Sequence, residues 1–444
     1  MQPEGQPADG PGSGAALAAQ IDAALDAAFA AVEAALAQVV SCSDCDDVQD
    51  ASTGAVAELL VRGLSSLDAS VARRAALAIA RFVLGDSEDF AASAVMASSD
   101  GAVLPALARL AASGDDAVAD AAWTAMYWLV LGIGDQQGTA ARCAATDGVV
   151  EGLIKAVMQR ATPWAALKVI YILLLHRGPE APGQFAAADG FCARLVAFAA
   201  TVGDSPCQWR NDSLWQAYDD QFESCWSALK CILSLLESEP EATVPALMAA
   251  EGLWPALEGL VGRAASTRDG NEYGAVSAAI RTIQALAEQS AAAARRAAGL
   301  DGLLARLAAA LAQPQYRQWP HGAAQAIPGK AGDALRAIAS RGGGNGEAAV
   351  AAAVAGVLAC AADDDSKQRL RDWLAAPPMR MGAGAIAALE LQVVEAAALR
   401  ARVAELEAIP VNTRAAIVEL AHAVRGKRRR EEDEEAAVGK EQRR

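Results

Sequence analysis

Two eight-residue stretches, "WAALKVIY" at 164–171 and "WSALKCIL" at 226–233, place the same residue types at the same positions. Counted from the tryptophan as position 0, apolar residues stand at +2, +3 and +6, which is the spacing of one face of an α-helix. Four other stretches carry the same apolar triad, which predicts six equivalent helices facing one core. The six triads are Ala78, Ile79 and Phe82; Ala125, Met126 and Leu129; Ala166, Leu167 and Ile170; Ala228, Leu229 and Ile232; Ala279, Ile280 and Ile283; and Ala334, Leu335 and Ile338.

A glycine precedes each of these stretches and opens a shorter amphipathic segment. Glycine supplies the backbone freedom that ends one helix and turns the chain sharply into the next. A period of about 40–47 residues with two or three helices is typical of HEAT and armadillo arrays. The glycines are Gly54, Gly101, Gly148, Gly190, Gly252 and Gly302, at intervals of 47, 47, 42, 62 and 50 residues.

Each repeat then consists of a short helix that ends near an Asp-Gly pair, a second helix such as "AVLPALARLAA", and a longer third helix with the triad. In these features the chain resembles the armadillo family over residues 50–340. The alanine-rich composition predicts an all-α protein. The resemblance implies a right-handed α-solenoid of about six armadillo-type repeats, and the amphipathic segments that follow predict a C-terminal helical extension. The resemblance also implies a protein that binds extended peptides or partner domains along a concave surface and is not an enzyme.

Helix geometry separates the triad from positions 0 and +4. Each residue of an α-helix turns by about 100° around the helix axis, so the three side chains of the triad point in directions centred at about 250°. The side chains at positions 0 and +4 point in directions of about 0° and 40°. These two positions therefore flank the core, and stacking of the repeats would align them in a stripe. The stripe is aromatic in its middle and cationic at its C-terminal end. Its candidate binding residues are Trp123, Tyr127, Trp164, Lys168, Trp226, Lys230, Arg281 and Arg336.

Two interpretations of this stripe remain open. Lysine and arginine beside a core often lie along the surface, and a flanking tryptophan often seals the contact between repeats. Alternatively, the rings supply flat apolar contact and the cations pair with carboxylates or phosphates of a ligand.

The stripe also departs from the importin-α-type groove that it resembles. That groove typically has asparagine at position +4, where it holds a peptide main chain, and uses acidic pockets for basic peptides. Here the position holds Tyr127, Lys168, Lys230 and two arginines, which would repel a basic peptide. We therefore expect the ligand to be an acidic or phosphorylated extended segment of another protein.

The longest interval between glycines contains an insertion at 203–222 that we interpret as a loop. It combines Trp209, Trp215 and Tyr218 with several aspartates. Insertions on one face of a solenoid often carry binding function. The alternative is that this loop folds over the groove, with its acids against Lys168 and Lys230.

Composition and charge narrow the class of protein. The chain has 444 residues and is 53% hydrophobic but 5% aromatic, because alanine, the best helix former, dominates. The net charge of −16 argues against a general nucleic-acid binder. Eight scattered cysteines and an N-terminus without a signal sequence predict an intracellular protein, cytoplasmic or nuclear or both. Charges and glycines interrupt the apolar stretches, so we expect no membrane span.

The ends of the chain are predicted from composition. We expect a disordered N-terminus at 1–14, a helical cap at 15–49, a flexible break at 341–346, a degenerate capping repeat at 347–376, C-terminal helices at 384–425 and a charged, disordered tail at 426–444. The C-terminal helices carry a weak coiled-coil signal, although packing on the end of the solenoid fits better. The basic cluster of the tail, a possible nuclear-localisation signal, is Lys427, Arg428, Arg429 and Arg430.

Catalytic and metal-binding chemistry finds little support. His176, His321 and His422 lie in separate segments without a nucleophile or phosphate-loop motif. Cys42 and Cys45 lack two further zinc ligands at suitable spacing. We therefore predict no enzyme, cofactor or metal, and an intracellular scaffold for protein–protein interaction. The alternatives are an armadillo-type co-chaperone that exchanges the nucleotide of Hsp70, and a nucleic-acid-associated protein.

Overall fold

The computed structural model describes residues 56–408 except 67, 84–87, 99–101, 133–134, 161–162, 177–179, 202–211, 265–269 and 314–325. Within these ranges the chain is helical and contains no strand. The chain divides into two units, Met1–Val350 and Ala351–Arg444. The predicted N-terminal cap and charged tail lie outside the described residues.

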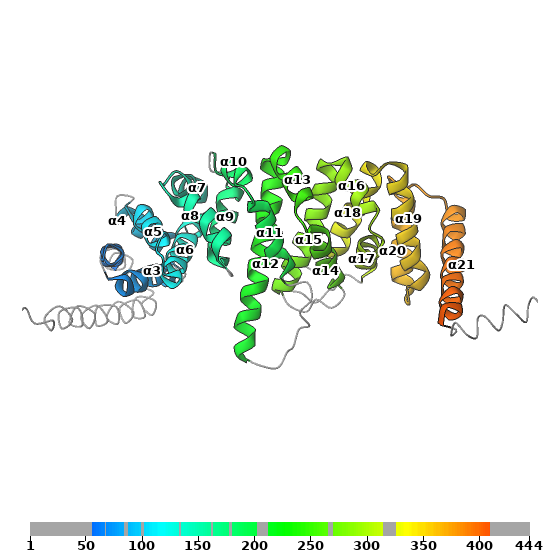
Figure 1. Ribbon diagram of the computed structural model, residues 1–444, viewed down its shortest axis with the longest axis horizontal. Helices are drawn as coiled ribbons and strands as arrows, with labels where there is room; N and C mark the ends of the chain where they lie inside the picture. Colours follow the sequence, from blue (N-terminus) through cyan, green and yellow to red (C-terminus); the bar gives the residue numbers. More distant parts are fainter. Residues whose placement is uncertain are drawn as a thin grey trace, which may run out of the picture. The chain divides into compact units, whose positions relative to one another are not determined.

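The third helices of the predicted repeats form a continuous stack in the first unit. Each packs against the next, so that helices far apart in the sequence lie side by side (Figure 1). They are α3 (Ala69–Val83), α6 (Asp116–Leu131), α9 (Trp164–Leu175), α12 (Asp212–Ser238), α15 (Gly270–Gln289) and α18 (Ala326–Arg341).

Two shorter helices precede each third helix from α6 to α18, as the sequence predicts, and the described residues before α3 hold one, at 56–64. Second helices contact one another from α5 to α17 and so form a second layer of the stack. This order of three helices per repeat confirms an all-α, armadillo-like solenoid of six repeats. The second helices are 56–64, α5 (Val103–Ala111), α8 (Val149–Gln159), α11 (Phe191–Ala200), α14 (Leu253–Gly262) and α17 (Asp301–Ala312). The first helices are α4 (Glu88–Ser98), α7 (Gln136–Ala144), α10 (Ala181–Ala187), α13 (Pro240–Ala249) and α16 (Ala291–Ala298).

The apolar triads form the core of this stack. Every triad residue is buried except Ala78, which is half-buried. Alanine at +2 leaves little side chain between neighbouring helices, and the larger residues at +3 and +6 fill the interior. The triad therefore predicted the core correctly.

The glycines have two different roles. Gly148, Gly190 and Gly252 adopt positive φ values of 78°, 71° and 89° and form the N-caps of α8, α11 and α14. These values lie in the left-handed region that glycine enters without strain. Gly302 lies inside α17 instead, so its prediction as a turn residue is wrong. Gly54 and Gly101 fall outside the described residues.

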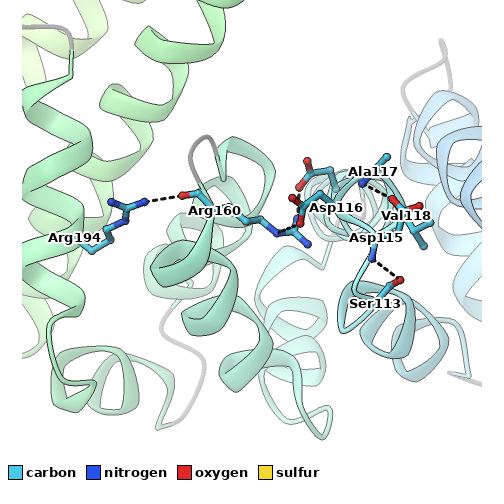
Figure 2. A network of polar contacts seen from close by, with 8 residues as sticks. Ser113, Asp115, Asp116, Ala117, Val118, Arg160 and Arg194 are labelled. Atoms are coloured by element: carbon cyan, nitrogen blue, oxygen red, sulfur yellow. Dashed lines mark hydrogen bonds and ion pairs between the residues drawn. The ribbon is translucent and has the colours of Figure 1, made fainter.

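Polar contacts between α6, the end of α8 and α11 join three successive repeats. The Arg160 guanidinium lies 3.3 Å from Asp116 and also pairs with Asp120, both on α6 (Figure 2). Arg194 of α11 donates hydrogen bonds to the carbonyls of Arg160 (2.7 Å) and Val157 (3.2 Å) at the end of α8. Burial raises the pKa of Asp120 despite the opposing effect of Arg160. Three repeats are therefore linked through the carboxyl end of α8.

The second unit contains the end of α19 (Gly343–Cys360), α20 (Asp364–Ala375) and α21 (Ala383–Ala408). Arg371 of α20 pairs with Glu390 of α21 at 3.1 Å. Leu391, Val394 and Leu399 of α21 are exposed.

The predicted flexible break at 341–346 is wrong. Gly342 is the one non-helical residue between α18 and α19, and α19 begins at Gly343. By length and composition alone, α19 could span a membrane, and 33% of its 18 residues are buried within the protein.

Candidate ligand-binding cleft

Positions 0 and +4 of α9 and α12 form two equivalent lysine–aromatic groups. The Lys168 ammonium lies 5.1 Å from the ring centroid of Trp164 on its own helix and 5.4 Å from that of Tyr127 on α6. The Lys230 ammonium lies 3.7 Å from the ring centroid of Trp226 and 4.4 Å from that of Tyr171 on α9. In both groups, the cation therefore contacts one ring from its own helix and one from the preceding third helix.

Trp123 does not belong to this surface, so its prediction as a binding residue is wrong. Its side chain is fully buried, and its ring faces Gly152 of α8, where an added Cβ would lie 3.4 Å from the ring. The angular argument considered one helix alone, whereas the next repeat covers the flank of α6. Trp123 seals the contact between repeats, the role that the sequence left open.

Lys168 already has an internal anion. The Glu223 carboxylate of α12 lies 3.0 Å from its ammonium, and both side chains are about one-fifth exposed. A partly buried pair of this kind is screened less than a surface pair. An incoming anion would have to displace Glu223 to reach Lys168.

Lys230 borders an open cleft instead. Among the side chains that the structure describes, no carboxylate lies within ion-pair distance of its ammonium, and Glu223 acts on it only from farther away. Burial lowers the pKa of Lys230 from its ordinary value. The cleft has a volume of about 420 Å³ between α9, α12 and α15, and Tyr171, Trp226 and Tyr273 supply its aromatic walls.

One residue of α15 explains why this cleft is open. Gly274 stands three residues before position 0 of α15, the position that Glu223 holds in α12. An added Cβ at Gly274 would lie 2.9 Å from the indole atoms Cε2 and Nε1 of Trp226. The glycine therefore lets the indole lie against α15 and provides no side chain at the position from which Glu223 reaches Lys168.

Two more cations gather at the same cleft. Arg281 lines it and pairs with Glu237 at 3.4 Å, with both side chains about half exposed. Lys330 of α18 donates a hydrogen bond to the hydroxyl of Ser277, which also lines the cleft. Burial, and then the charge of Arg281, lower the pKa of Lys330. The positive charge of Arg281 therefore acts on both the cleft and Lys330.

Arg336 does not extend this cluster. It pairs with Asp333 of its own helix at 2.6 Å and is not among the residues that line the cleft. The predicted cationic stripe is therefore shorter than expected, because Arg336 has an acidic neighbour one turn away.

The insertion is not a loop throughout. Trp215 and Tyr218 lie on the helical backbone of α12, which begins at Asp212. Trp209 and the basic cluster Lys427–Arg430 lie outside the described residues. The loop prediction for 212–222 is wrong because these residues extend the third helix toward its N-terminus.

Sequence reasoning missed four residues that shape this region: Tyr171, Glu223, Gly274 and Lys330. The last residue of "WAALKVIY" is Tyr171, so a template extended to position +7 would have included it. A template extended back to position −3, three residues before the tryptophan position, would have shown that Glu223 of one repeat corresponds to Gly274 of the next. Lys330 shows no such signal, because only the packing of α18 on α15 brings it to Ser277.

Comparison with known proteins gives a fold-level likeness. No family description and no curated protein matches the chain. One engineered protein of known structure is 22% identical, and the match covers 64% of this chain and 97% of that one with a TM-score of 0.45. A structure from work on the phosphorylation switch between cadherin and beta-catenin is 15% identical, and the match covers 75% of this chain and 59% of that one with a TM-score of 0.48. A designed armadillo repeat protein in complex with peptide (KR)4 is 16% identical, and the match covers 63% of this chain and 98% of that one with a TM-score of 0.42.

Proposed function

We propose that this protein is a binding scaffold whose third helices hold an extended segment of a partner protein. The Lys230 cleft anchors an acidic or phosphorylated residue of that segment. One observation carries the proposal. Two equivalent lysines lie over paired aromatic rings, and Lys230, which has no carboxylate within ion-pair distance among the described residues, borders an open cleft.

Glu223 supports the acidic character of the ligand. Its carboxylate lies 3.0 Å from the Lys168 ammonium, which lies 5.1 and 5.4 Å from its two ring centroids, so a lysine between two rings can also contact an anion. Lys230 has the same arrangement without that carboxylate, so a ligand anion would fill the equivalent position. Since burial disfavours the charged ammonium, an arriving anion would also offset part of that electrostatic penalty.

The walls of the cleft suit a peptide beside the anion. Tyr171 and Trp226 offer flat surfaces for aliphatic stems, and Leu175 at the edge of the cleft is 52% exposed. Exposed large apolar side chains next to a charged cleft are a common feature of protein-binding surfaces. Helices α9 and α12 together therefore provide both apolar contact and charge.

Matched variants test this proposal in the full chain. An array of acidic, neutral and basic extended peptides is measured by fluorescence polarisation against wild type, Lys230→Met and Lys168→Met. We expect wild type to bind acidic peptides, Lys230→Met to weaken that binding at least tenfold and Lys168→Met to change it less than threefold. Circular dichroism checks that both variants fold. Equal losses in both, or a preference for basic peptides, would contradict the proposal.

A further inference from the structure

The charges around Ser277 are unevenly balanced. Lys230 and Arg281 line the cleft from α12 and α15, and Lys330 reaches Ser277 from α18. Glu237 is the one carboxylate among the described residues that line it. Lys230 and Arg281 in the lining, with Lys330 beside it, exceed Glu237 by two positive charges. Glu223 also acts on Lys230, but its charge is offset by its own partner, Lys168.

This surplus distinguishes two kinds of anion. A carboxylate side chain carries one negative charge and two acceptor oxygens, whereas a phosphate monoester carries about −1.5 to −2 charge near pH 7 and three strong acceptor oxygens. A carboxylate would leave about one of the cations without a counter-charge. A phosphoryl group would match the surplus and has enough oxygens to contact donors from three helices.

The hydrogen bonding of Ser277 adds a donor. Its hydroxyl oxygen accepts from the Lys330 ammonium, so its proton can be donated to an acceptor in the cleft. Ser277 is buried, at 8% exposed, so this donor belongs to the buried part of the cleft lining. Lys330 thus holds a hydroxyl in place and contributes positive charge.

From these contacts we propose that the cleft between α9, α12 and α15 binds a phosphorylated side chain of a partner protein in preference to a carboxylate. The inference rests on the proposed function and names the class of residue that occupies the site. Lys230 contacts the phosphoryl group on one side, Arg281 and the Ser277 hydroxyl contact it on the other, and Lys330 stabilises its second charge. The aromatic rings of Tyr171 and Trp226 contact the flanking peptide.

Three peptides that differ at one residue test the inference. They carry phosphoserine, aspartate or serine at the central position of the best acidic sequence, and their affinities for the full-length protein are measured by isothermal titration calorimetry. We expect the phosphopeptide to bind on the order of tenfold more tightly than the aspartate peptide, and the serine peptide to bind weakest.

Lys330→Met separates the inference from general electrostatics. We expect it to reduce the preference for phosphoserine over aspartate to about twofold while changing aspartate affinity little. Arg336→Met is the matched control, because it removes a cation from the same helix outside the cleft, and we expect the tenfold preference to persist. Thermal unfolding of both variants shows whether either substitution disturbs the fold.

The outcomes distinguish the two proposals. Equal affinity for phosphoserine and aspartate, each lost in Lys230→Met, would overturn the phosphoryl inference and leave the acidic-segment scaffold standing. Failure of every acidic peptide to bind would overturn both. If millimolar inorganic phosphate competes as strongly as the phosphopeptide, the site binds a free ion only. If single-stranded RNA displaces the phosphopeptide, the ligand is a nucleic acid. Either result overturns the inference.

Discussion

Lys168 and Lys230 occupy the same position in successive repeats, and each ammonium lies over two aromatic rings. The first group is closed by Glu223, whereas the second borders a cleft of about 420 Å³. The helix that follows decides this difference: α12 presents a glutamate three residues before its position 0, and α15 presents Gly274. One shared framework therefore yields an internal ion pair in one repeat and a candidate binding site in the next.

The largest effect on stability that we expect comes from the core leucines beneath the two lysine–aromatic groups. Leu167 and Leu229 stand at position +3 and are fully buried. Replacing either by alanine leaves a cavity, so we expect each substitution to lower the free energy of unfolding by about 2–5 kcal/mol. Urea unfolding followed by circular dichroism measures both. A loss in one repeat much larger than in the other would show that the framework is not equivalent.

Gly274→Ala tests why the second group is open. The new Cβ would lie 2.9 Å from the Trp226 indole, and displacing that ring costs about 1–3 kcal/mol, more than the gain of about 0.5–1 kcal/mol from helix propensity. We expect lower stability and altered tryptophan fluorescence.

Gly329→Ala is the control for that substitution. Gly329 holds the equivalent position in α18 and has nothing within 4 Å of an added Cβ. It should become slightly more stable, by about 0.5 kcal/mol. A stabilised Gly274→Ala with unchanged fluorescence would remove the explanation given for the cleft.

Glu223→Gln should make the first group resemble the second. The amide keeps the size of the side chain but removes the charge that pairs with Lys168, so we expect a loss of about 1–2 kcal/mol in stability. We also expect a gain of a few-fold in affinity for acidic peptides. Glu258→Gln, which removes a comparable charge beside Arg306, is the control and should leave peptide affinity unchanged. Unchanged affinity in both variants would mean that Lys168 has no access to ligand.

The smallest effect is a pH dependence at Lys230. Because burial lowers its pKa below the ordinary 10.5, its ammonium loses its proton earlier than an exposed lysine as the pH rises. We therefore expect affinity for an acidic peptide to fall in the alkaline range below pH 10.5. Burial raises the pKa of the neighbouring Tyr171, so its hydroxyl becomes negatively charged only at a higher pH than that of an ordinary tyrosine. Lys230→Arg should retain affinity across this range, and an identical decline in both proteins would contradict the assignment.

Much of the fold followed from local pattern. The apolar triad and its period predicted three helices per repeat and the buried faces, because helix periodicity and stacking need only the order of apolar residues. The break predicted at 341–346 failed for the opposite reason. Its glycines are poor helix formers on their own, yet α19 includes them from Gly343. Gly342 and Gly346 are buried, so packing can override local propensity at these two positions, whereas Gly343 and Gly344 are exposed.

The candidate site was only half predictable. Lys230, Trp226 and Arg281 could be named because they repeat at fixed offsets along the chain. Trp123 stands at the same offset but is buried, because Gly152 of the next repeat makes room for its ring. An offset places a residue on its helix, and the neighbouring helix decides whether that residue meets solvent.

The sequence by itself determined the repeat, the core and the sign of the charge along the third helices, since each depends on spacing within one helix. Only the tertiary structure decided which cation remains open, because that depends on residues brought together from different helices. Glu223 neutralises Lys168 from 55 positions away, whereas Gly274 leaves Lys230 facing a cleft that Lys330 approaches from yet another repeat.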